Sequence, residues 1–169
     1  HSTRVSITRS SFAHCGDDSP EWSLCLRPLF ADHVTVAHDW FHDCRGCDFI
    51  HGRAGPHLGI AHNTFARALA CRTGAEKCFH SDDIELFDAD GLWITANRFG
   101  VTQLGAGQIS LTGAVDYAKV TNNLLLRSDR RAPGVMSPAG IVVGSRGSLT
   151  QPLHVDIINN TVLSGRAAH

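Results

Sequence analysis

Side chains that can move protons are concentrated in the middle of the sequence. Histidine and carboxylate groups act as general acids and bases, and an arginine beside them can neutralise a substrate's negative charge. The candidate catalytic residues of these types are His51, Arg53, His80, Asp83 and Glu85. Carboxylate oxygens are also the ligands that Ca²⁺ prefers. We therefore predict a Ca²⁺ site at Asp82, Asp83 and Glu85.

A repeated pattern explains how residues so far apart in sequence can meet. Two apolar residues in alternation are followed by a small polar residue and then, two places on, by an aromatic or aliphatic residue. The six copies are Val5-x-Ile7 with Ser10-x-Phe12, Val34-x-Val36 with Asp39-x-Phe41, Leu58-x-Ile60 with Asn63-x-Phe65, Leu92-x-Ile94 with Asn97-x-Phe99, Ala118-x-Val120 with Asn123-x-Leu125, and Val155-x-Ile157 with Asn160-x-Val162. Repeats at such spacing predict a solenoid.

Each copy predicts two short strands joined by a corner. The alternation of Leu92 and Ile94 places both side chains on one face, as a strand requires. Asparagine tolerates the left-handed backbone conformation, so we expect Asn97 to form the tight corner. Stacked copies would then bring Asn63, Asn97 and Asn123 into a row whose amides bond to one another.

A third strand precedes each later copy, and its outward residues supply the candidate site. If Leu26, Ile50, Ile84 and Ile109 point inward, then the outward side chains form rows across neighbouring coils. One row reads Arg27, His51, Glu85 and Ser110, and the other reads Cys25, Phe49, Asp83 and Gln108. We predict that this exposed face binds substrate through Arg27, Gln108 and Ser110, with help from Arg127 and Arg130 in the loop that follows the fifth copy.

Three short strands per coil, an asparagine corner and one variable loop resemble the right-handed parallel β-helix of pectate lyases, polygalacturonases and mannuronan epimerases. Leu92-Trp93-Ile94-Thr95-Ala96-Asn97-Arg98-Phe99 is the most typical copy. We therefore expect an all-β right-handed parallel β-helix of about six coils, forming a single domain over residues 1–169, either as a whole protein or as a fragment of a longer chain. A β-sandwich with regularly spaced strands is the alternative.

The resemblance implies a secreted protein that acts on polysaccharide. Related enzymes neutralise a uronate carboxylate with Ca²⁺ or a basic residue and then remove the proton at C5, so lyase or epimerase chemistry is the favoured activity. Many activities share this fold, and enzymatic activity itself stays open. The alternative is a non-catalytic carbohydrate-binding, adhesive or structural module.

Composition limits the partners. The net charge is −1 and the pI about 6.9, with no basic stripe, so we do not expect nucleic-acid binding. No long apolar run predicts a membrane span, and no signal peptide is visible because the repeat begins at once. Uncapped solenoid ends make end-to-end self-association an open possibility.

Six cysteines lie in or near the variable loops. An even number in loops favours disulfides and an oxidising compartment, although sequence alone does not fix their pairing. Proximity in sequence favours Cys15–Cys25 and Cys71–Cys78, and Cys44 and Cys47 can close on each other. A zinc site or a redox-active pair is the alternative.

Overall fold

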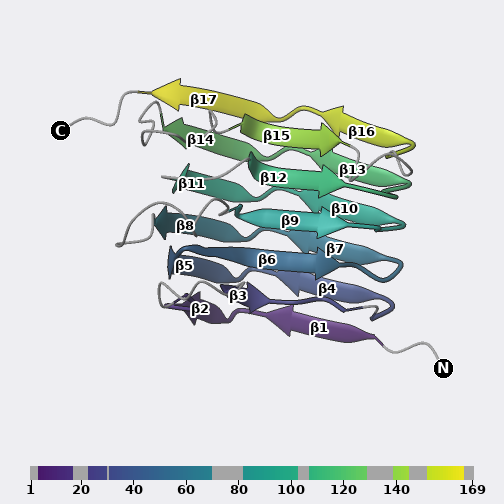
Figure 1. The fold of residues 1–169 in the computed structure, drawn as a ribbon, viewed down its shortest axis with the longest axis horizontal. Helices are drawn as coiled ribbons and strands as arrows, with labels where there is room; N and C mark the ends of the chain where they lie inside the picture. Colours follow the sequence, from purple (N-terminus) through teal and green to yellow (C-terminus); the bar gives the residue numbers. More distant parts are fainter. Residues whose placement is uncertain are drawn as a thin grey trace.

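The structure is a computed structural model that describes residues 4–16, 23–29, 31–69, 82–102, 107–128, 139–144 and 152–165. These residues form 17 β-strands and no helix. The strands stack in layers along one axis, with the first coil at one end and the last at the other (Figure 1). None of the described segments is a helix of the length and hydrophobicity that a membrane crossing needs.

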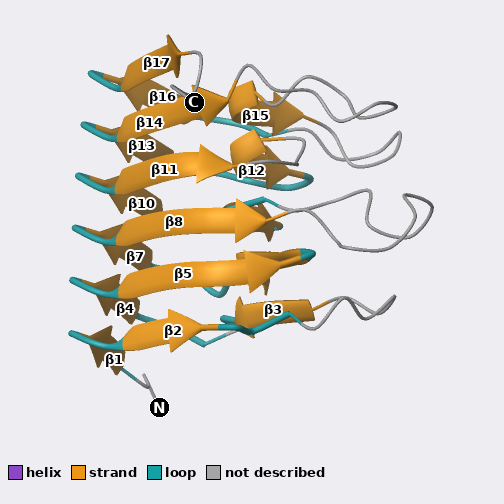
Figure 2. Ribbon diagram, turned by 90° about the vertical axis from the view of Figure 1, so that its left-hand side faces the viewer, coloured by secondary structure: helices purple, strands orange, loops and turns teal. Residues whose placement is uncertain are grey.

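The strands belong to three parallel sheets, and the chain visits the sheets in turn (Figure 2). Sheet A contains β1 (Val5–Thr8), β4 (Val34–Ala37), β7 (Leu58–Ala61), β10 (Leu92–Thr95), β13 (Ala118–Thr121) and β16 (Val155–Ile158). Sheet B contains β2 (Ser11–Ala13), β5 (Trp40–Arg45), β8 (Thr64–Leu69), β11 (Arg98–Thr102), β14 (Leu124–Ser128) and β17 (Thr161–Gly165). Sheet C contains β3 (Ser23–Leu26), β6 (Cys47–Arg53), β9 (Ile84–Phe87), β12 (Gly107–Thr112) and β15 (Ala139–Gly144).

This architecture is the predicted right-handed β-helix of about six coils, and the β-sandwich alternative is wrong. The predicted register is confirmed as well. In sheet A, Leu58 pairs with Leu92 and Ile60 with Ile94. In sheet C, Ile50 pairs with Ile84, which pairs in turn with Ile109. Corresponding residues of the repeat therefore lie one above another, and this brings the candidate site residues onto neighbouring strands.

The core runs along the axis as stacked layers of equivalent side chains. Phe12, Phe41, Phe65 and Phe99 form a column whose successive ring centroids are 4.7, 4.9 and 4.8 Å apart. Phe49 packs against this column, 6.1 Å from the ring of Phe41, and is fully buried. The prediction that Phe49 points outward is therefore wrong, because the aromatic column offers this large apolar side chain a buried contact.

The predicted asparagine row is confirmed at the corner between sheets A and B. The backbone N–H of Asn63 donates to Asn97 Oδ1 at 2.9 Å, and the backbone N–H of Asn97 donates to Asn123 Oδ1 at the same distance. The left-handed residue, however, is the one before each asparagine, such as His62 or Ala96. The asparagines are selected for their amide hydrogen bonds, and the positive φ falls on the preceding residue.

Two of the predicted disulfides are present, Cys15–Cys25 and Cys44–Cys47. Cys44 and Cys47 are buried in the core between sheets B and C. Cys71 and Cys78, the third predicted pair, lie outside the described residues.

Candidate functional site

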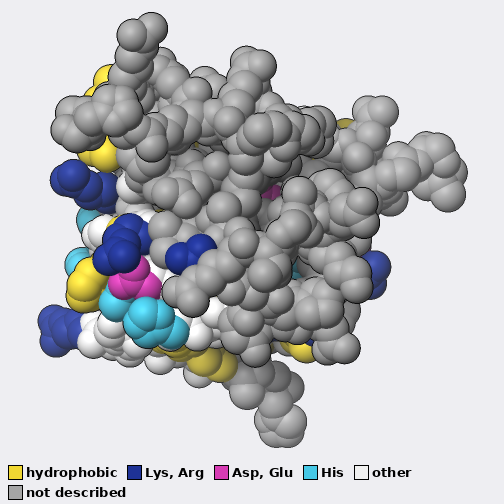
Figure 3. All heavy atoms as spheres, turned by 60° about the vertical axis from the view of Figure 1, so that its left-hand side comes forward, with side chains coloured by type: hydrophobic (Ala, Val, Ile, Leu, Met, Phe, Trp, Pro, Cys, Tyr) yellow, Lys and Arg dark blue, Asp and Glu magenta, His cyan; other side chains and the backbone are white. Residues whose placement is uncertain are grey.

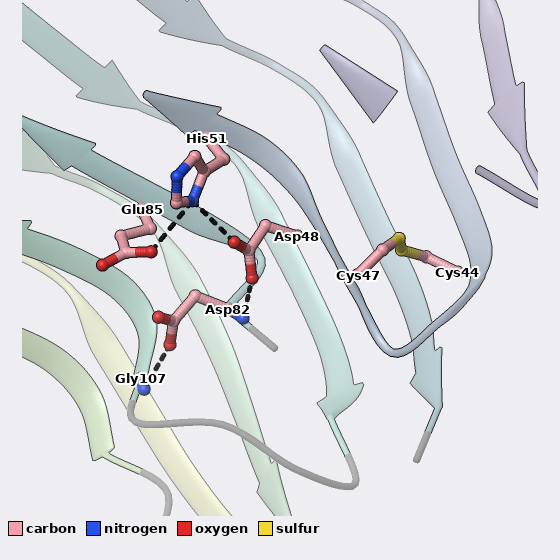
Figure 4. Close-up of polar contacts among 7 residues, drawn as sticks. All are labelled: Cys44, Cys47, Asp48, His51, Asp82, Glu85 and Gly107. Atoms are coloured by element: carbon pink, nitrogen blue, oxygen red, sulfur yellow. Dashed lines mark hydrogen bonds and ion pairs between the residues drawn. A yellow bond between two sulfur atoms is a disulfide. The ribbon is translucent and has the colours of Figure 1, made fainter. Parts of the chain in front are cut away.

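The predicted site residues of sheet C form part of a continuous polar cluster. His51 on β6 and Glu85 on β9 are paired in register, and His51 Nδ1 lies 2.9 Å from Glu85 Oε2. The same nitrogen lies 2.7 Å from Asp48 Oδ2. One imidazole nitrogen therefore bridges two carboxylates from neighbouring coils (Figure 4). Asp48 was missed in the sequence because it precedes Phe49, whose inward turn breaks the simple alternation.

Asp82 extends the cluster through backbone hydrogen bonds. Its N–H donates to Asp48 Oδ1 at 2.7 Å, and its Oδ1 accepts from the Gly107 N–H at 2.6 Å. The chain of contacts from His51 to Gly107 thus joins three successive strands of sheet C (Figure 4). Asp83, which the sequence also placed here, is buried beside Asp82.

The predicted exposure of this face is wrong for the residues of the polar cluster, which are buried. His51 and Glu85 retain only 7% and 8% of their accessible surface, and Asp82 retains none. Burial lowers the pKa of a histidine, but the hydrogen bonds that His51 donates to the carboxylates of Asp48 and Glu85 outweigh it and raise the pKa of His51 to about 9. Desolvation and the nearby Asp48 charge raise the pKa of Asp82 to about 8, despite the hydrogen bond from Gly107. At neutral pH the cluster therefore holds an imidazolium and a protonated carboxyl group.

Other predicted residues of this face have structural partners. Arg53 Nε lies 3.0 Å from Asp88 Oδ2 in a half-exposed ion pair. Gln108 Nε2 donates to the carbonyls of Gly100 and Leu126, at 2.8 and 3.0 Å, and so links sheet C to sheet B. Arg27 is exposed, and its side chain lies over Gly52, where a Cβ atom would meet Arg27 Cγ at 3.2 Å.

Four predicted residues remain. One is buried, and the side chains of the other three lie outside the part of the chain that the structure describes. Ser110 is buried and pairs with Glu85 across β9 and β12. His80 and Arg130 lie outside the described residues, as does the side chain of Arg127 on β14. Their predicted roles stay predictions.

The predicted Ca²⁺ ligands suit the ion poorly in this arrangement. Glu85 already pairs with the His51 imidazolium, and Asp82 Oδ1 already accepts from the Gly107 N–H. Asp48, His51 and Glu85 do bring three donor atoms within 4.8 Å of one another. That donor set, with one imidazole and two carboxylates, differs from the all-oxygen shell of Ca²⁺.

A second candidate site lies on the outer face of sheet A, which sequence reasoning overlooked. A groove of about 460 Å³ is lined by Arg4, Val5, Ser6, His33, Thr35, His57, Gly59 and Trp93. Trp93 is 41% exposed and pairs in register with Gly59, so the indole borders a depression where one coil has no side chain. In the sequence, this groove could have been recognised from an outward-facing tryptophan that aligns with an outward-facing glycine one coil away.

One wall of the groove is a stack of rings at the corner that leads into sheet A. The imidazoles of His33 and His57 lie 4.4 Å apart, and the ring of Trp93 follows at 6.2 Å from His57. Asp32 Oδ1 lies 2.7 Å from His33 Nδ1 and 3.2 Å from His57 Nδ1. These contacts fix both histidines beside the groove.

No protein-family model matches the chain, and no curated protein or solved structure resembles it significantly.

Proposed function

We propose that the protein binds an extended anionic polysaccharide on the outer face of sheet A. The observation that carries this proposal is the exposed indole of Trp93 beside the open floor at Gly59. Aromatic rings offer a large rigid apolar surface, and a sugar ring presents a matching apolar face. Coils repeat at about 4.8 Å, so a chain that lies across them meets equivalent positions in succession.

The charges around the groove favour an anionic chain. Arg4 lines one end, and Lys119 pairs with Trp93 at the other. Both cations are exposed, so they attract carboxylates or sulfates without a large desolvation cost. Such attraction is screened by salt. Affinity for pectate, alginate or a sulfated glycosaminoglycan should therefore fall as ionic strength rises.

Titration calorimetry with these three polymers tests the proposal. Trp93→Ala should raise the dissociation constant about tenfold, equivalent to about 1.4 kcal/mol. Tyr117→Ala is the matched control, because Tyr117 is also exposed at this corner but stacks on His154 outside the groove. Equal polysaccharide affinities in the two variants, or no binding by the unmodified protein, would contradict the proposal.

A second candidate function is acid–base chemistry on a uronate at the sheet C cluster. The observation that favours it is the pair of raised pKa values, about 9 at His51 and about 8 at Asp82, because such shifts are concentrated at catalytic sites. His51 is protonated at neutral pH, so its predicted role as a base gives way to neutralising the uronate carboxylate. Glu85 would accept the C5 proton, and Asp82 would protonate the departing oxygen in a lyase.

This second function ranks below binding because the cluster is buried and a substrate must reach it. Incubation with a uronate polymer in deuterated water, followed by mass spectrometry, reports both chemistries, because an epimerase leaves deuterium at C5 and a lyase cleaves the chain to an unsaturated product. Glu85→Gln should abolish either product, whereas Asp156→Asn, a change of an exposed carboxylate on β16, should leave it intact. Absence of both products with the unmodified protein, with and without added Ca²⁺, would exclude this function.

Secretion fits either function. The Cys15–Cys25 and Cys44–Cys47 disulfides are typical of oxidising compartments and support an extracellular location.

A further inference from the structure

A third group of polar residues lies on the outer face of sheet B. Phe12, Phe41 and Phe65 point inward, so the alternate positions of β2, β5 and β8 face outward. Ser11 pairs in register with Trp40, and Ala13 pairs with His42. Ser11 and His42 are therefore diagonal neighbours on adjacent strands, close enough for their side chains to meet.

The contacts among Ser11, His42 and Asp43 follow a fixed order. His42 Nδ1 lies 2.7 Å from Asp43 Oδ2, and the ionised carboxylate only accepts hydrogen bonds. The proton of a neutral imidazole must then sit on Nδ1, which leaves Nε2 as an acceptor. Nε2 lies 3.0 Å from Ser11 Oγ, so the serine hydroxyl donates to it.

Two further contacts hold this geometry. Arg67 Nε lies 2.9 Å from Asp43 Oδ1, which orients the carboxylate. The hydrogen bond to His42 is the main reason that the pKa of Asp43 is lowered, so Asp43 remains ionised. The Trp40 indole stacks on the His42 ring with a centroid distance of 3.7 Å. Figure 3 shows acidic, basic and histidine side chains gathered on the part of the surface turned forward in that view.

We propose that Ser11, His42 and Asp43 form a nucleophile, base and orienting group that hydrolyse esters. A hydroxyl, an imidazole and a carboxylate in this order are recognised by geometry and role, whatever their sequence order. This site is separate from the sheet A groove and from the sheet C cluster, and it does not rest on either proposed function.

The reaction proceeds through an acyl-enzyme. Ser11 Oγ attacks the ester carbonyl while its proton passes to His42 Nε2, and the tetrahedral intermediate expels the alcohol, which takes that proton. Water then attacks the acyl-serine and gives its proton to His42. The second tetrahedral intermediate then expels Ser11 Oγ, which takes the proton back from His42, and the carboxylic acid is released. Trp40 N–H donates to the Ser10 carbonyl, so alternation turns the Ser11 N–H away from β5. Because β2 is the outermost strand of sheet B among the described residues, this N–H can bind the oxyanion.

The neighbouring surface points to an acylated sugar as the substrate class. A hollow of about 420 Å³ beside Trp40 is lined by His38, Asp39, His62 and Thr64. Trp40 is 51% exposed, so a ring-shaped alcohol can lie against the indole while its ester reaches Ser11. Ala13 and Ala66, the register neighbours of His42, leave the space beside its imidazole open for an acyl group such as acetyl.

Hydrolysis of p-nitrophenyl acetate tests the triad. Ser11→Ala and His42→Ala should each lower kcat/KM at least about a hundredfold, in the range expected for loss of a general base or nucleophile. Ser10→Ala is the control, because the neighbouring Ser10 hydroxyl bonds to the Thr8 carbonyl and not to a histidine. Its rate should match that of the unmodified protein.

Labelling of the unmodified protein supplies a result that does not depend on how variants fold. A fluorophosphonate should modify Ser11, as located by peptide mass spectrometry, and His42→Ala should block the labelling. If Ser11 is not labelled, or if Ser11→Ala hydrolyses the ester at the original rate because a histidine attacks it directly, the proposal is overturned.

Discussion

Asp39 lies directly against Asn63 in the hydrogen-bonded row at the corner between sheets A and B. The Asp39 N–H donates to Asn63 Oδ1 at 2.9 Å, and Asp39 Oδ1 accepts from the Ser10 N–H at 2.7 Å. In each asparagine of the row, Nδ2 donates to a carbonyl of the preceding coil, as from Asn63 to Val36. Asp39 has an oxygen in that place, and its Oδ2 is buried without a hydrogen-bond partner.

Asp39→Asn should therefore stabilise the protein. The new amide can donate where the Asp39 oxygen is buried and unpaired. We expect a gain of about 1 kcal/mol in the free energy of unfolding. Urea unfolding at neutral pH measures it, and an unchanged or lower stability would contradict this account of the row.

Asn97→Ala should have the opposite effect. Asn97 is buried, its Nδ2 donates to the Ile60 carbonyl, and its Oδ1 accepts from Asn63. Loss of these bonds leaves buried backbone groups unpaired, at a cost of at least about 2 kcal/mol. Asn122→Ala is the control, because Ala96 already occupies the equivalent left-handed position one coil earlier. The account of the row fails if the two variants melt at the same temperature.

Stability should fall as the pH rises from about 6.5 to about 9. The pKa of His51 is near 6.5 in the unfolded chain and about 9 in the folded protein, so folding takes up a proton in this window. The stabilisation that protonated His51 provides is complete below about pH 6.5 and is lost as the pH rises through about 9. The raised pKa of Asp82 acts with the same sign, because folding also favours its protonated form.

The loss should be on the order of 1–2 kcal/mol once solvent screening is allowed for. Chemical unfolding measured at several pH values gives the profile. His51→Gln should reduce its slope and leave the part that Asp82 contributes, whereas His62→Gln, a change at an exposed histidine that stacks on His38, should not change it. A profile of His51→Gln that keeps the original slope would show that other groups dominate.

The Cys15–Cys25 disulfide should be present and stabilising in the native protein. It ties the first strands of sheets B and C together across the coil. Replacing both cysteines by serine should cost about 2 kcal/mol, since the unfolded chain regains the freedom of that loop. Peptide mapping after alkylation without reductant checks the bond directly, and an alkylated Cys15 or Cys25 would count against it.

The fold could be predicted from the sequence because aligning the copies of the repeat also determines which residues pair between neighbouring strands. Once Ile60 and Ile94 were aligned, the pairing of His51 with Glu85 followed, as the structure confirms. What failed was strict alternation near Cys47, where Phe49 turns into the aromatic column. That local break hid Asp48 and, with it, the second carboxylate of the His51 cluster.

The repeat pattern could not predict which outward side chains are buried or which of them make contact between coils. Outward residues of a sheet are usually solvated, so nothing in the sequence indicated that Glu85 would be almost fully buried. The diagonal contact of Ser11 with His42 was present in the aligned copies, but it requires both the register and the rotamers. The groove at Trp93 forms where a neighbouring residue has no side chain. A repeat pattern defined by residue type does not reveal such a gap.

Filling the floor of the sheet A groove tests the proposed polysaccharide binding most directly. A Cβ atom added at Gly59 would have Val34 O, at 3.9 Å, as its nearest neighbour, so Gly59→Val fits the strand. Valine also favours β-structure, so the melting temperature should stay the same or rise. We predict that Gly59→Val keeps the fold but loses calorimetric binding of the anionic polysaccharide. Undiminished affinity in a folded Gly59→Val protein would contradict the proposal.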